Sequence, residues 1–205
     1  MDITIIDYEV GNKKSIQNLI TRIGYSSNIS SNHAQINRAD KLILPGVGSF
    51  SYGIKNLIKN NLVDILRTKV LIDKTPILGI CLGMQLFSDW SEEGDTAGLG
   101  WIPGDTIKFK NSDINSRHKI PHIGWNSLNI INSNSIMQNI DKNSLFYFAH
   151  SYHFKCSDKN CIVSTTQYSE KFVSSVQREN IFGTQFHPEK SHKFGIQILK
   201  NFIEL

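Results

Sequence analysis

The chain has 205 residues, of which 40% are hydrophobic and 20% are charged, and its formal net charge is +4. This composition excludes a disordered chain, because apolar residues are spread along the whole length and the charge imbalance is small. The 14 glycines follow no fixed period, which excludes collagen-like and repeat proteins. We therefore expect residues 1–205 to form one globular domain.

The longest apolar stretches, such as residues 77–80, are far shorter than the roughly 18 to 20 residues of a membrane-spanning helix. Residues 1–7 lack the basic start and apolar length of a signal peptide. We expect a cytoplasmic protein without a membrane partner, in which Cys81, Cys156 and Cys161 stay reduced. Basic and acidic residues are interspersed, even around the lysine-rich stretch 108–119, so we also expect no nucleic-acid partner.

The first half alternates short apolar runs with amphipathic segments, which is the pattern of a parallel sheet covered by helices. In chain order, it first predicts a strand over residues 3–7, a helix carrying Ile16, Leu19, Ile20 and Ile23, and strands over 25–30 and 41–44. Two short helices follow, one carrying Ile54, Leu57 and Ile58 and the other carrying Val63, Leu66 and Val70. A strand over residues 76–80 and a helix over 82–89 complete this half.

The second half has a different pattern. Between about Trp101 and Val176, short strands alternate with polar turns such as Asn132-Ser133-Asn134-Ser135, which predicts antiparallel hairpins inserted on one edge of the sheet. A buried strand over residues 181–186 and an amphipathic helix over 191–205 follow. The expected fold is α/β, with a mostly parallel central sheet flanked by helices and an antiparallel, strand-rich insertion.

Gly79-Ile80-Cys81-Leu82-Gly83 follows an apolar strand and opens a helix, the context of a nucleophile elbow. Glycines on both sides allow a sharp turn that projects the Cys81 side chain from the carboxyl edge of the sheet. The amide groups at the start of the helix, beginning with Leu82, favour the thiolate. A plain buried strand cysteine is the alternative, and the flanking glycines favour the nucleophile.

A thiolate that attacks an acyl group needs a partner that protonates the leaving group and activates water. His187 is the best placed histidine, because it follows the last buried strand and Pro188 disfavours a helical conformation for it. In an extended segment Glu189 points to the same side as the imidazole and orients it. We therefore predict a catalytic set of Cys81, His187 and Glu189. The alternative is that His187 is only a surface or helix-capping histidine.

Gly46, Val47 and Gly48 end another strand at the same expected edge, after Pro45. Glycines let backbone N–H groups approach a substrate, so this segment is the candidate oxyanion site, with an ordinary Pro-Gly turn as the alternative. Gln85, one turn beyond Cys81, is a candidate substrate ligand, and Glu93 offers a carboxylate for an amino group. In isolation, either is more commonly a solvated surface residue.

These motifs, in this order, resemble the class I, triad-type glutamine amidotransferases, and within them most closely the glutaminase subunits of imidazole glycerol phosphate synthases. The matching segments, which span the chain, are Ile5 to Tyr8 with Gly11-Asn12, Leu44 to Gly48, Gly79 to Leu86, Ser91 to Gly94, Gly98 to Gly100, Pro121 to Asn126, His150 to Tyr152 and Phe182 to Ser191. Of these, Pro121-His122-Ile123-Gly124-Trp125-Asn126 is the most selective.

The resemblance implies a Rossmann-like fold and hydrolysis of L-glutamine to glutamate and ammonia without a cofactor or a metal. It implies that Cys81 attacks the side-chain amide, that His187 protonates the departing ammonia, and that the resulting thioester is hydrolysed. The oxyanion and glutamine sites implied by the matching positions are Gly48, Leu82, Gln85, Glu93, Ser151 and Tyr152.

The resemblance also implies a heterodimer with a (βα)8-barrel cyclase that receives the ammonia and makes imidazole glycerol phosphate and AICAR in histidine biosynthesis. Positions matching Asn12, Trp125, Asn126 and Lys190 would lie at that interface, although Trp125 could instead be a core residue. Resting activity is expected to be low until the segment Gly46-Val47-Gly48 changes conformation.

Glu9 stands where the family usually carries glycine, near the expected interface. Cys156 and Cys161 lie outside every motif and are interpreted as structural or incidental. Two alternatives remain open. One is a paralogous subunit that supplies ammonia for the amidination of a nucleotide sugar in surface polysaccharide biosynthesis, and the other is a non-catalytic binding module on the same fold.

Overall fold

The structure is a computed structural model that describes residues 1–110, 119–132 and 135–205. Its strands are β1 Ile3–Ile6, β2 Asn28–Ser30, β3 Lys41–Leu44, β4 Ile77–Ile80, β5 Trp90–Ser91, β6 Thr96–Ala97, β7 Gly104–Lys108, β8 His122–Ser127, β9 Asn129–Ile130, β10 Leu145–His150, β11 Tyr152–Cys156, β12 Ile162–Gln167, β13 Lys171–Arg178 and β14 Ile181–Thr184. Its α-helices are α1 Lys13–Ile23, α2 His33–Arg38, α3 Phe50–Lys59, α4 Val63–Arg67, α5 Leu82–Gln85 and α6 His192–Ile203, with a π-helical turn η1 Thr68–Ile72 and 3₁₀ turns η2 Ser135–Met137, η3 Lys159–Cys161 and η4 Pro188–Lys190.

The main sheet has the strand order β2-β1-β3-β4-β14-β13-β11-β7-β5-β6. The first five of these strands are parallel, and β13, β11 and β7 follow as antiparallel neighbours. All four residues of β1, β3, β4 and β14 are buried, as expected for parallel strands with helices on both faces. The predicted α/β fold with a mostly parallel centre and an antiparallel edge is confirmed.

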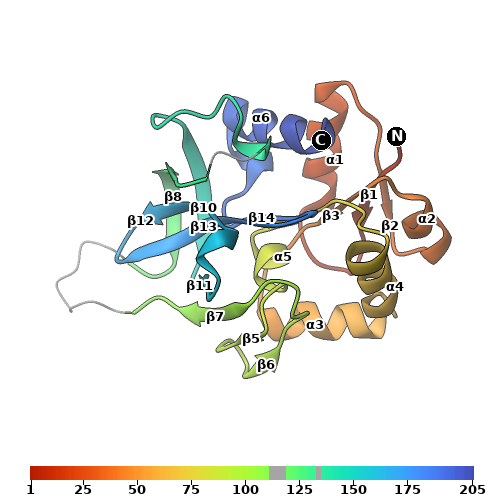
Figure 1. Ribbon diagram of the computed structural model, residues 1–205, viewed down its shortest axis with the longest axis horizontal. Coiled ribbons are helices and arrows are strands. Elements are labelled where there is room, and N and C mark those ends of the chain that lie inside the picture. Colours follow the sequence, from red (N-terminus) through yellow and green to blue (C-terminus); the bar gives the residue numbers. More distant parts are fainter. Residues whose placement is uncertain (111–118, 133–134) are drawn as a thin grey trace.

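Helices cover both faces of the sheet (Figure 1). The alternation of side chains along β3 divides the core, because Leu42 and Leu44 pack with the buried residues of α3 and α4 while Ile43 packs with those of α1 and α6. The C-terminal helix lies beside α1 in Figure 1. The centre of the sheet is therefore packed against helices on both faces. This packing holds the carboxyl ends of β3, β4 and β14 in fixed positions.

The insertion is more complex than a set of hairpins on one edge. Strands β7, β11, β12 and β13 extend the main sheet, but β8 and β10 pair with each other in a separate two-stranded antiparallel sheet. The pattern of short strands and polar turns could not distinguish these arrangements, because pairing partners are set by contacts distant in sequence. The polar turn expected at Asn132-Ser133-Asn134-Ser135 and the basic stretch at 108–119 lie in part outside the described residues.

One local prediction was wrong, and one helix was missed. The helix expected over residues 82–89 ends at Gln85, because the backbone N–H groups of Leu99, Gly100 and Trp101 bind the carbonyls of residues 86, 88 and 87 and close the chain into a turn. Helix α2 was not predicted, since Ile36 is its single buried apolar residue. Its start is nevertheless marked by Asn32, whose side chain accepts hydrogen bonds from the N–H groups of Ala34 and Gln35.

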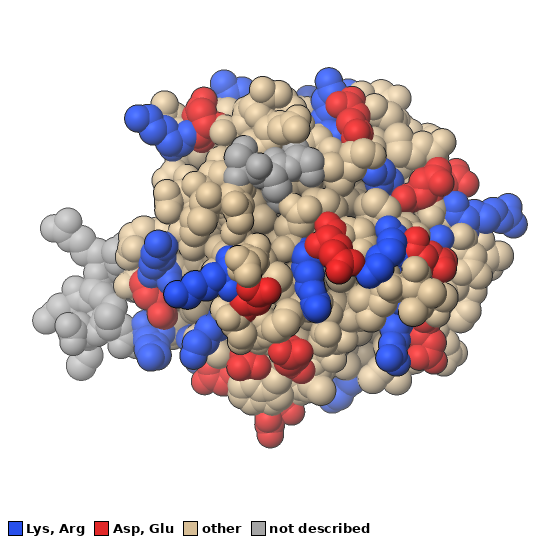
Figure 2. Space-filling view, in the orientation of Figure 1, with Lys and Arg blue, Asp and Glu red and all other residues tan. Residues whose placement is uncertain are grey.

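The charged residues are mixed on the surface. On the face shown in Figure 2, Lys and Arg side chains alternate with Asp and Glu, as the interspersed sequence pattern indicates. Among the described residues, none of the helices has the length and apolar character needed to cross a membrane.

Candidate active site

The turn after β4 holds Cys81 in a strained backbone conformation. Its φ of 54° and ψ of −108° lie outside the regions that non-glycine residues usually adopt, at a cost of about 1 to 3 kcal/mol. The neighbouring glycines make this turn possible, because a Cβ at Gly83 would lie 1.9 Å from the carbonyl oxygen of Leu44 and one at Gly79 would lie 2.6 Å from the ring of Phe87. The predicted elbow is therefore present, and helix α5 begins directly after it.

His187 and Glu189 lie together beyond the carboxyl end of β14. The His187 Nδ1 atom donates a 2.8 Å hydrogen bond to Glu189 Oε1, and both side chains are 2% exposed. The geometry differs from the expected extended dipeptide, because Glu189 belongs to the 3₁₀ turn η4. The turn is held by Ser191, whose hydroxyl donates to the His187 carbonyl at 2.6 Å, so it still brings the carboxylate to the imidazole.

Electrostatics at His187 favour the imidazolium. Burial disfavours the charged ring, but the Cys81 sulfur, which is hydrogen-bonded to the imidazole, and the Glu189 carboxylate together raise the pKa of His187 from 6.5 to about 10. Since Nδ1 faces Glu189, the other ring nitrogen faces the sulfur. The structure therefore brings the three predicted residues together as a thiol, an imidazole and a carboxylate.

The segment Pro45 to Gly48 leaves β3 beside the elbow. A Cβ at Gly46 would lie 2.5 Å from the Gly83 nitrogen, so this glycine permits close backbone packing. Gly48 has a φ of +102°, and no described heavy atom lies within 4 Å of the position of a Cβ there. The buried phenol of Tyr8 donates a hydrogen bond to the Pro45 carbonyl. One end of the segment is therefore anchored, and at Gly48 the direction in which a Cβ would point is unobstructed.

A cavity of about 330 Å³ opens over the elbow. Its lining includes most of the predicted site residues, namely Val47, Gly48, Cys81, Leu82, Gln85, Glu93, Ser151, Tyr152, His187 and Lys190. Gly46 and Glu189 lie behind this wall rather than in it, the first against Leu82 and the second against the imidazole. The cavity volume suits a small polar substrate.

The candidate substrate ligands Gln85 and Glu93 are held in place by hydrogen bonds. The Gln85 amide nitrogen, on a side chain that is almost fully buried, donates to the Tyr152 carbonyl at 2.8 Å and to Gln185 Oε1 at 3.0 Å. Glu93 accepts a hydrogen bond from the backbone N–H of Phe50. Neither is a solvated surface residue, which was the alternative interpretation, and both are preorganised at the cavity wall.

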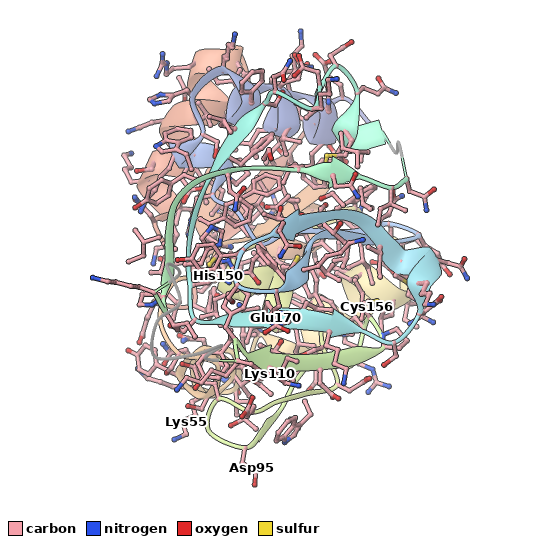
Figure 3. All side chains as sticks on the ribbon, turned by 90° about the vertical axis from the view of Figure 1, so that its left-hand side faces the viewer. Lys55, Asp95, Lys110, His150, Cys156 and Glu170 are labelled. Carbon is pink, nitrogen blue, oxygen red and sulfur yellow. The ribbon has the colours of Figure 1, made fainter. Side chains whose placement is uncertain are left out.

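Sequence reasoning missed a pair of buried histidines, His122 and His150, of which His150 lines the cavity. His150 Nδ1 donates to the Tyr152 carbonyl at 2.8 Å, so its Nε2 accepts from His122 Nδ1 at 3.1 Å. Burial holds the pKa of His150 well below its usual value of 6.5, against the hydrogen bond to Tyr152, which raises it. Figure 3 shows His150 in the interior, between the strands. Both histidines occur in the matched motifs, but no local pattern placed them in contact.

The four candidate interface residues do not form part of the catalytic set. Trp125, on β8, is 45% exposed and stacks on His192 with a centroid distance of 5.0 Å, so the alternative of a core tryptophan is wrong. Lys190 reaches the cavity and lies 5.4 Å from the centroid of the Tyr147 ring. Asn12 caps α1, and the Asn126 amide donates to the Gln167 carbonyl.

Glu9 occupies a backbone conformation that favours glycine, with a φ of +67°. This conformation explains why a glycine at this position is physically suitable. The Glu9 side chain forms an exposed ion pair with Lys59 at 3.0 Å, which links the loop after β1 to helix α3. Cys156 and Cys161 do not line the cavity, and burial raises the pKa of the Cys156 thiol to about 12. Within the described residues, no cluster of three or more His, Cys, Asp or Glu side chains is arranged to hold a metal ion.

The chain is similar to known proteins over almost its whole length. Residues 4–205 match the family model described as glutamine amidotransferase class-I. The chain is 50% identical over 202 residues to the imidazole glycerol phosphate synthase subunit HisH 2 of Methanococcus maripaludis, with 98% of each chain covered. It is 45% identical over 203 residues to subunit HisH 2 of Pseudomonas aeruginosa (99% of each chain) and 44% identical over 206 residues to subunit HisH of Methanocaldococcus jannaschii (99% of each).

Solved structures share the fold at low sequence identity. The structure of PurLQS from Thermotoga maritima has a TM-score of 0.70 at 16% identity and covers 99% of this chain and 97% of that one. A glutamine amidotransferase from the same organism has a TM-score of 0.64 at 17% identity and covers 100% of this chain and 84% of that one. These similarities concern the fold alone.

Proposed function

The chain belongs to the class-I glutamine amidotransferase family, and we propose that it is the glutaminase subunit of an imidazole glycerol phosphate synthase. The family match over residues 4–205 supports one domain over residues 1–205. The structural observation that carries the proposal is the contact of Cys81 with His187, and of His187 with Glu189, at the wall of one cavity. The relatives named as subunits of this synthase support the choice of pathway.

In the proposed reaction, the Cys81 thiolate attacks the side-chain carbonyl carbon of glutamine. The imidazolium of His187 gives its proton to the departing nitrogen, so that ammonia leaves and a γ-glutamyl thioester remains. His187, now neutral, takes a proton from water, which attacks the thioester and releases glutamate. Glu189 keeps the ring oriented and stabilises its charged form in both halves of the reaction.

The negative charge that develops on the carbonyl oxygen needs backbone donors. The N–H of Leu82, at the start of α5, supplies one, and a peptide of the segment Gly46-Val47-Gly48 supplies the other. The backbone freedom of Gly48, which has a φ of +102°, allows this segment two conformations, one of which turns a donor into the cavity. Low resting activity follows if the inactive conformation predominates until the partner binds its own ligand.

Glutamine is held by Gln85, Glu93, Ser151 and Tyr152, which line the same cavity as the nucleophile. The Glu93 carboxylate binds the substrate ammonium group by charge. This set requires no cofactor and no metal. A catalytic thiol is preserved in a reducing compartment, so we place the reaction in the cytoplasm.

The ammonia passes to a (βα)8-barrel cyclase that forms a heterodimer with this chain. Asn12, Trp125, Asn126 and Lys190 form the contact surface, and the exposed ring of Trp125 serves as its aromatic anchor. Transfer inside the complex keeps ammonia from being protonated in solvent, where it would no longer be a nucleophile.

Co-expression with the barrel cyclase of the same genome tests this function. We expect the two chains to co-purify and glutamate release to rise when the cyclase ligand is added. Fast glutamine hydrolysis by the isolated chain would contradict the proposed gating. Failure to bind the cyclase, together with binding to a nucleotide-sugar amidating enzyme, would favour the paralogous function, and absence of glutaminase activity in every complex would favour a binding module.

A further inference from the structure

Gln185 lies between the nucleophile and the substrate wall. Its side chain is fully buried, its Nε2 donates to Cys81 Sγ at 3.7 Å, and its Oε1 accepts from Gln85 Nε2 at 3.0 Å. Its backbone N–H is bonded to the Ser174 carbonyl at 2.9 Å, which fixes the chain just beyond β14. Alternation along this extended segment places Gln185 and His187 on the same side, toward Cys81, while Phe186 packs on the opposite side against Phe146.

The orientation of the Gln185 amide is determined by its neighbours. The Tyr152 carbonyl can only accept, so the Gln85 atom that faces it at 2.8 Å is Nε2. The same Gln85 nitrogen faces Gln185, so the Gln185 atom there must be the acceptor Oε1. The Nε2 group of Gln185 is consequently the one directed at sulfur.

We propose that Gln185 is a hydrogen-bond donor to the Cys81 thiolate and couples that thiolate to the glutamine-binding side chain Gln85. This inference rests on the proposed glutaminase function. A hydrogen bond to a charged acceptor is stronger than one to a neutral acceptor, so the bond favours the thiolate over both the thiol and the thioester. It therefore stabilises the reactive form of the sulfur and favours the return of the sulfur to its anionic form when the thioester is hydrolysed.

The hydrogen bond from Gln185 adds to the stabilisation that helix α5 gives to the Cys81 thiolate. Helix α5 has only four residues, so its dipole gives less stabilisation to the thiolate than a long helix would. His187 supplies the opposite charge, but it must also release its proton to the departing ammonia. Gln185 keeps its proton throughout the reaction, so its bond to sulfur persists in every step in which the sulfur is negative.

Two substitutions separate the two bonds of Gln185. Gln185→Met removes both with little change in volume, whereas Gln185→Glu keeps an acceptor for Gln85 but places an oxygen against the sulfur. Gln17→Met is the matched control, because Gln17 donates a 2.8 Å hydrogen bond to the Ser27 carbonyl and does not line the cavity. Circular dichroism and thermal unfolding would verify that each variant is folded.

The direct readout is the rate of Cys81 alkylation by iodoacetamide between pH 5 and 10, with the labelled peptide identified by mass spectrometry. In Gln185→Met we expect the pH of the half-maximal rate to rise by about one unit, and in Gln185→Glu by more than that, while Gln17→Met follows the unsubstituted chain. In the complex with the cyclase, kcat should fall in both Gln185 variants, and KM for glutamine should rise mainly in Gln185→Met, which leaves Gln85 without this acceptor.

Alkylation profiles of both Gln185 variants that superimpose on that of the unsubstituted chain would overturn the inference. If Gln185→Met does not fold, the isosteric Gln185→Glu variant decides, since a donor role requires its profile to shift. In Gln185→Met, a merely structural role would lower the unfolding temperature without shifting the profile. The outcome is separable from the proposed function, which fails only if the unsubstituted complex does not release glutamate from glutamine.

Discussion

The carboxylate of Glu93 accepts a 2.7 Å hydrogen bond from the backbone N–H of Phe50, the first residue of helix α3. The segment Pro45 to Gly48 precedes this helix by one residue, so the side chain proposed to bind the substrate ammonium group also holds the start of the helix that follows the proposed oxyanion segment. A negative charge at a helix N-terminus is favourable, which gives Glu93 a structural role besides substrate binding.

Glu93→Gln should therefore weaken substrate binding more than catalysis. The amide retains an oxygen for Phe50 but loses the charge, so KM for glutamine should rise about tenfold or more while kcat changes less. Steady-state kinetics of the complex provide the measurement. Glu92→Gln is the control, because Glu92 accepts from the Lys108 N–H at 2.8 Å and does not line the cavity. Equal KM values for the two variants would exclude Glu93 from the substrate site.

Cys81→Ala should separate glutamine hydrolysis from synthesis. Without the nucleophile, the glutamine-dependent rate should fall by at least about a thousandfold. Synthesis from added ammonium salt should continue, because the acceptor chemistry belongs to the partner. Cys161→Ala tests a buried thiol outside the cavity and should retain both activities. Loss of both activities in Cys81→Ala would show that the roles are assigned wrongly.

Glu189→Gln should change the pH dependence of kcat/KM. The Cys81 sulfur and Glu189 raise the pKa of His187 to about 10, so the imidazolium persists as the pH rises through neutrality and loses its proton only near pH 10. Removing the Glu189 charge lowers this pKa and should move the alkaline limb down by about one unit, in assays between pH 6 and 10.5. Glu170→Gln removes the carboxylate that lies 3.8 Å from His153 and should leave the limb in place. An alkaline limb unchanged in Glu189→Gln would contradict the proposed pairing.

The buried His150 should make the free energy of unfolding decrease as the pH falls below neutrality. Burial depresses its folded pKa below the unfolded value of 6.5, so the unfolded chain binds more protons once the pH falls below 6.5. Its contribution to stability is complete above 6.5 and is lost at about 1.4 kcal/mol per pH unit below it. Urea unfolding at pH 7.5 and 5.5 should show a smaller pH effect for His150→Gln than for the unsubstituted chain, with the exposed His33→Gln as the control. Identical pH effects for His150→Gln and the unsubstituted chain would exclude this explanation.

Gly83→Ala should destabilise the elbow. The added Cβ would lie 1.9 Å from the Leu44 carbonyl oxygen, a backbone atom, so β3 and α5 would have to separate. We expect a loss of about 2 kcal/mol or more in the free energy of unfolding. Gly53→Ala is the matched comparison, because its Cβ would meet only the ends of the flexible side chains of Leu82 and Leu86, both at 3.3 Å, and its effect should stay within about 1 kcal/mol. Equal stabilities of the two variants would argue against the close packing at the elbow.

Much of the site was predictable because its chemistry depends on short segments. The glycines around Cys81 signalled the elbow, and the dipeptide His187-Pro188 after a buried strand signalled the base. The same alternation that was applied to Glu189 would have identified Gln185, two residues before His187, as a side chain directed toward the nucleophile. The paired histidines His122 and His150 gave no such signal, since their contact depends on the pairing of β8 with β10.

The amino-acid pattern alone determined the apolar strands, the amphipathic helices and the tight turn at Cys81, because these depend on side-chain periodicity and on the backbone freedom of nearby glycines. The tertiary structure decided which strands became neighbours. The parallel pairing of β14 with β4 joins segments about a hundred residues apart, and it carries His187 and Gln185 to the sulfur. Such pairings follow from the burial of both faces of the whole sheet at once, and no local segment contains that information.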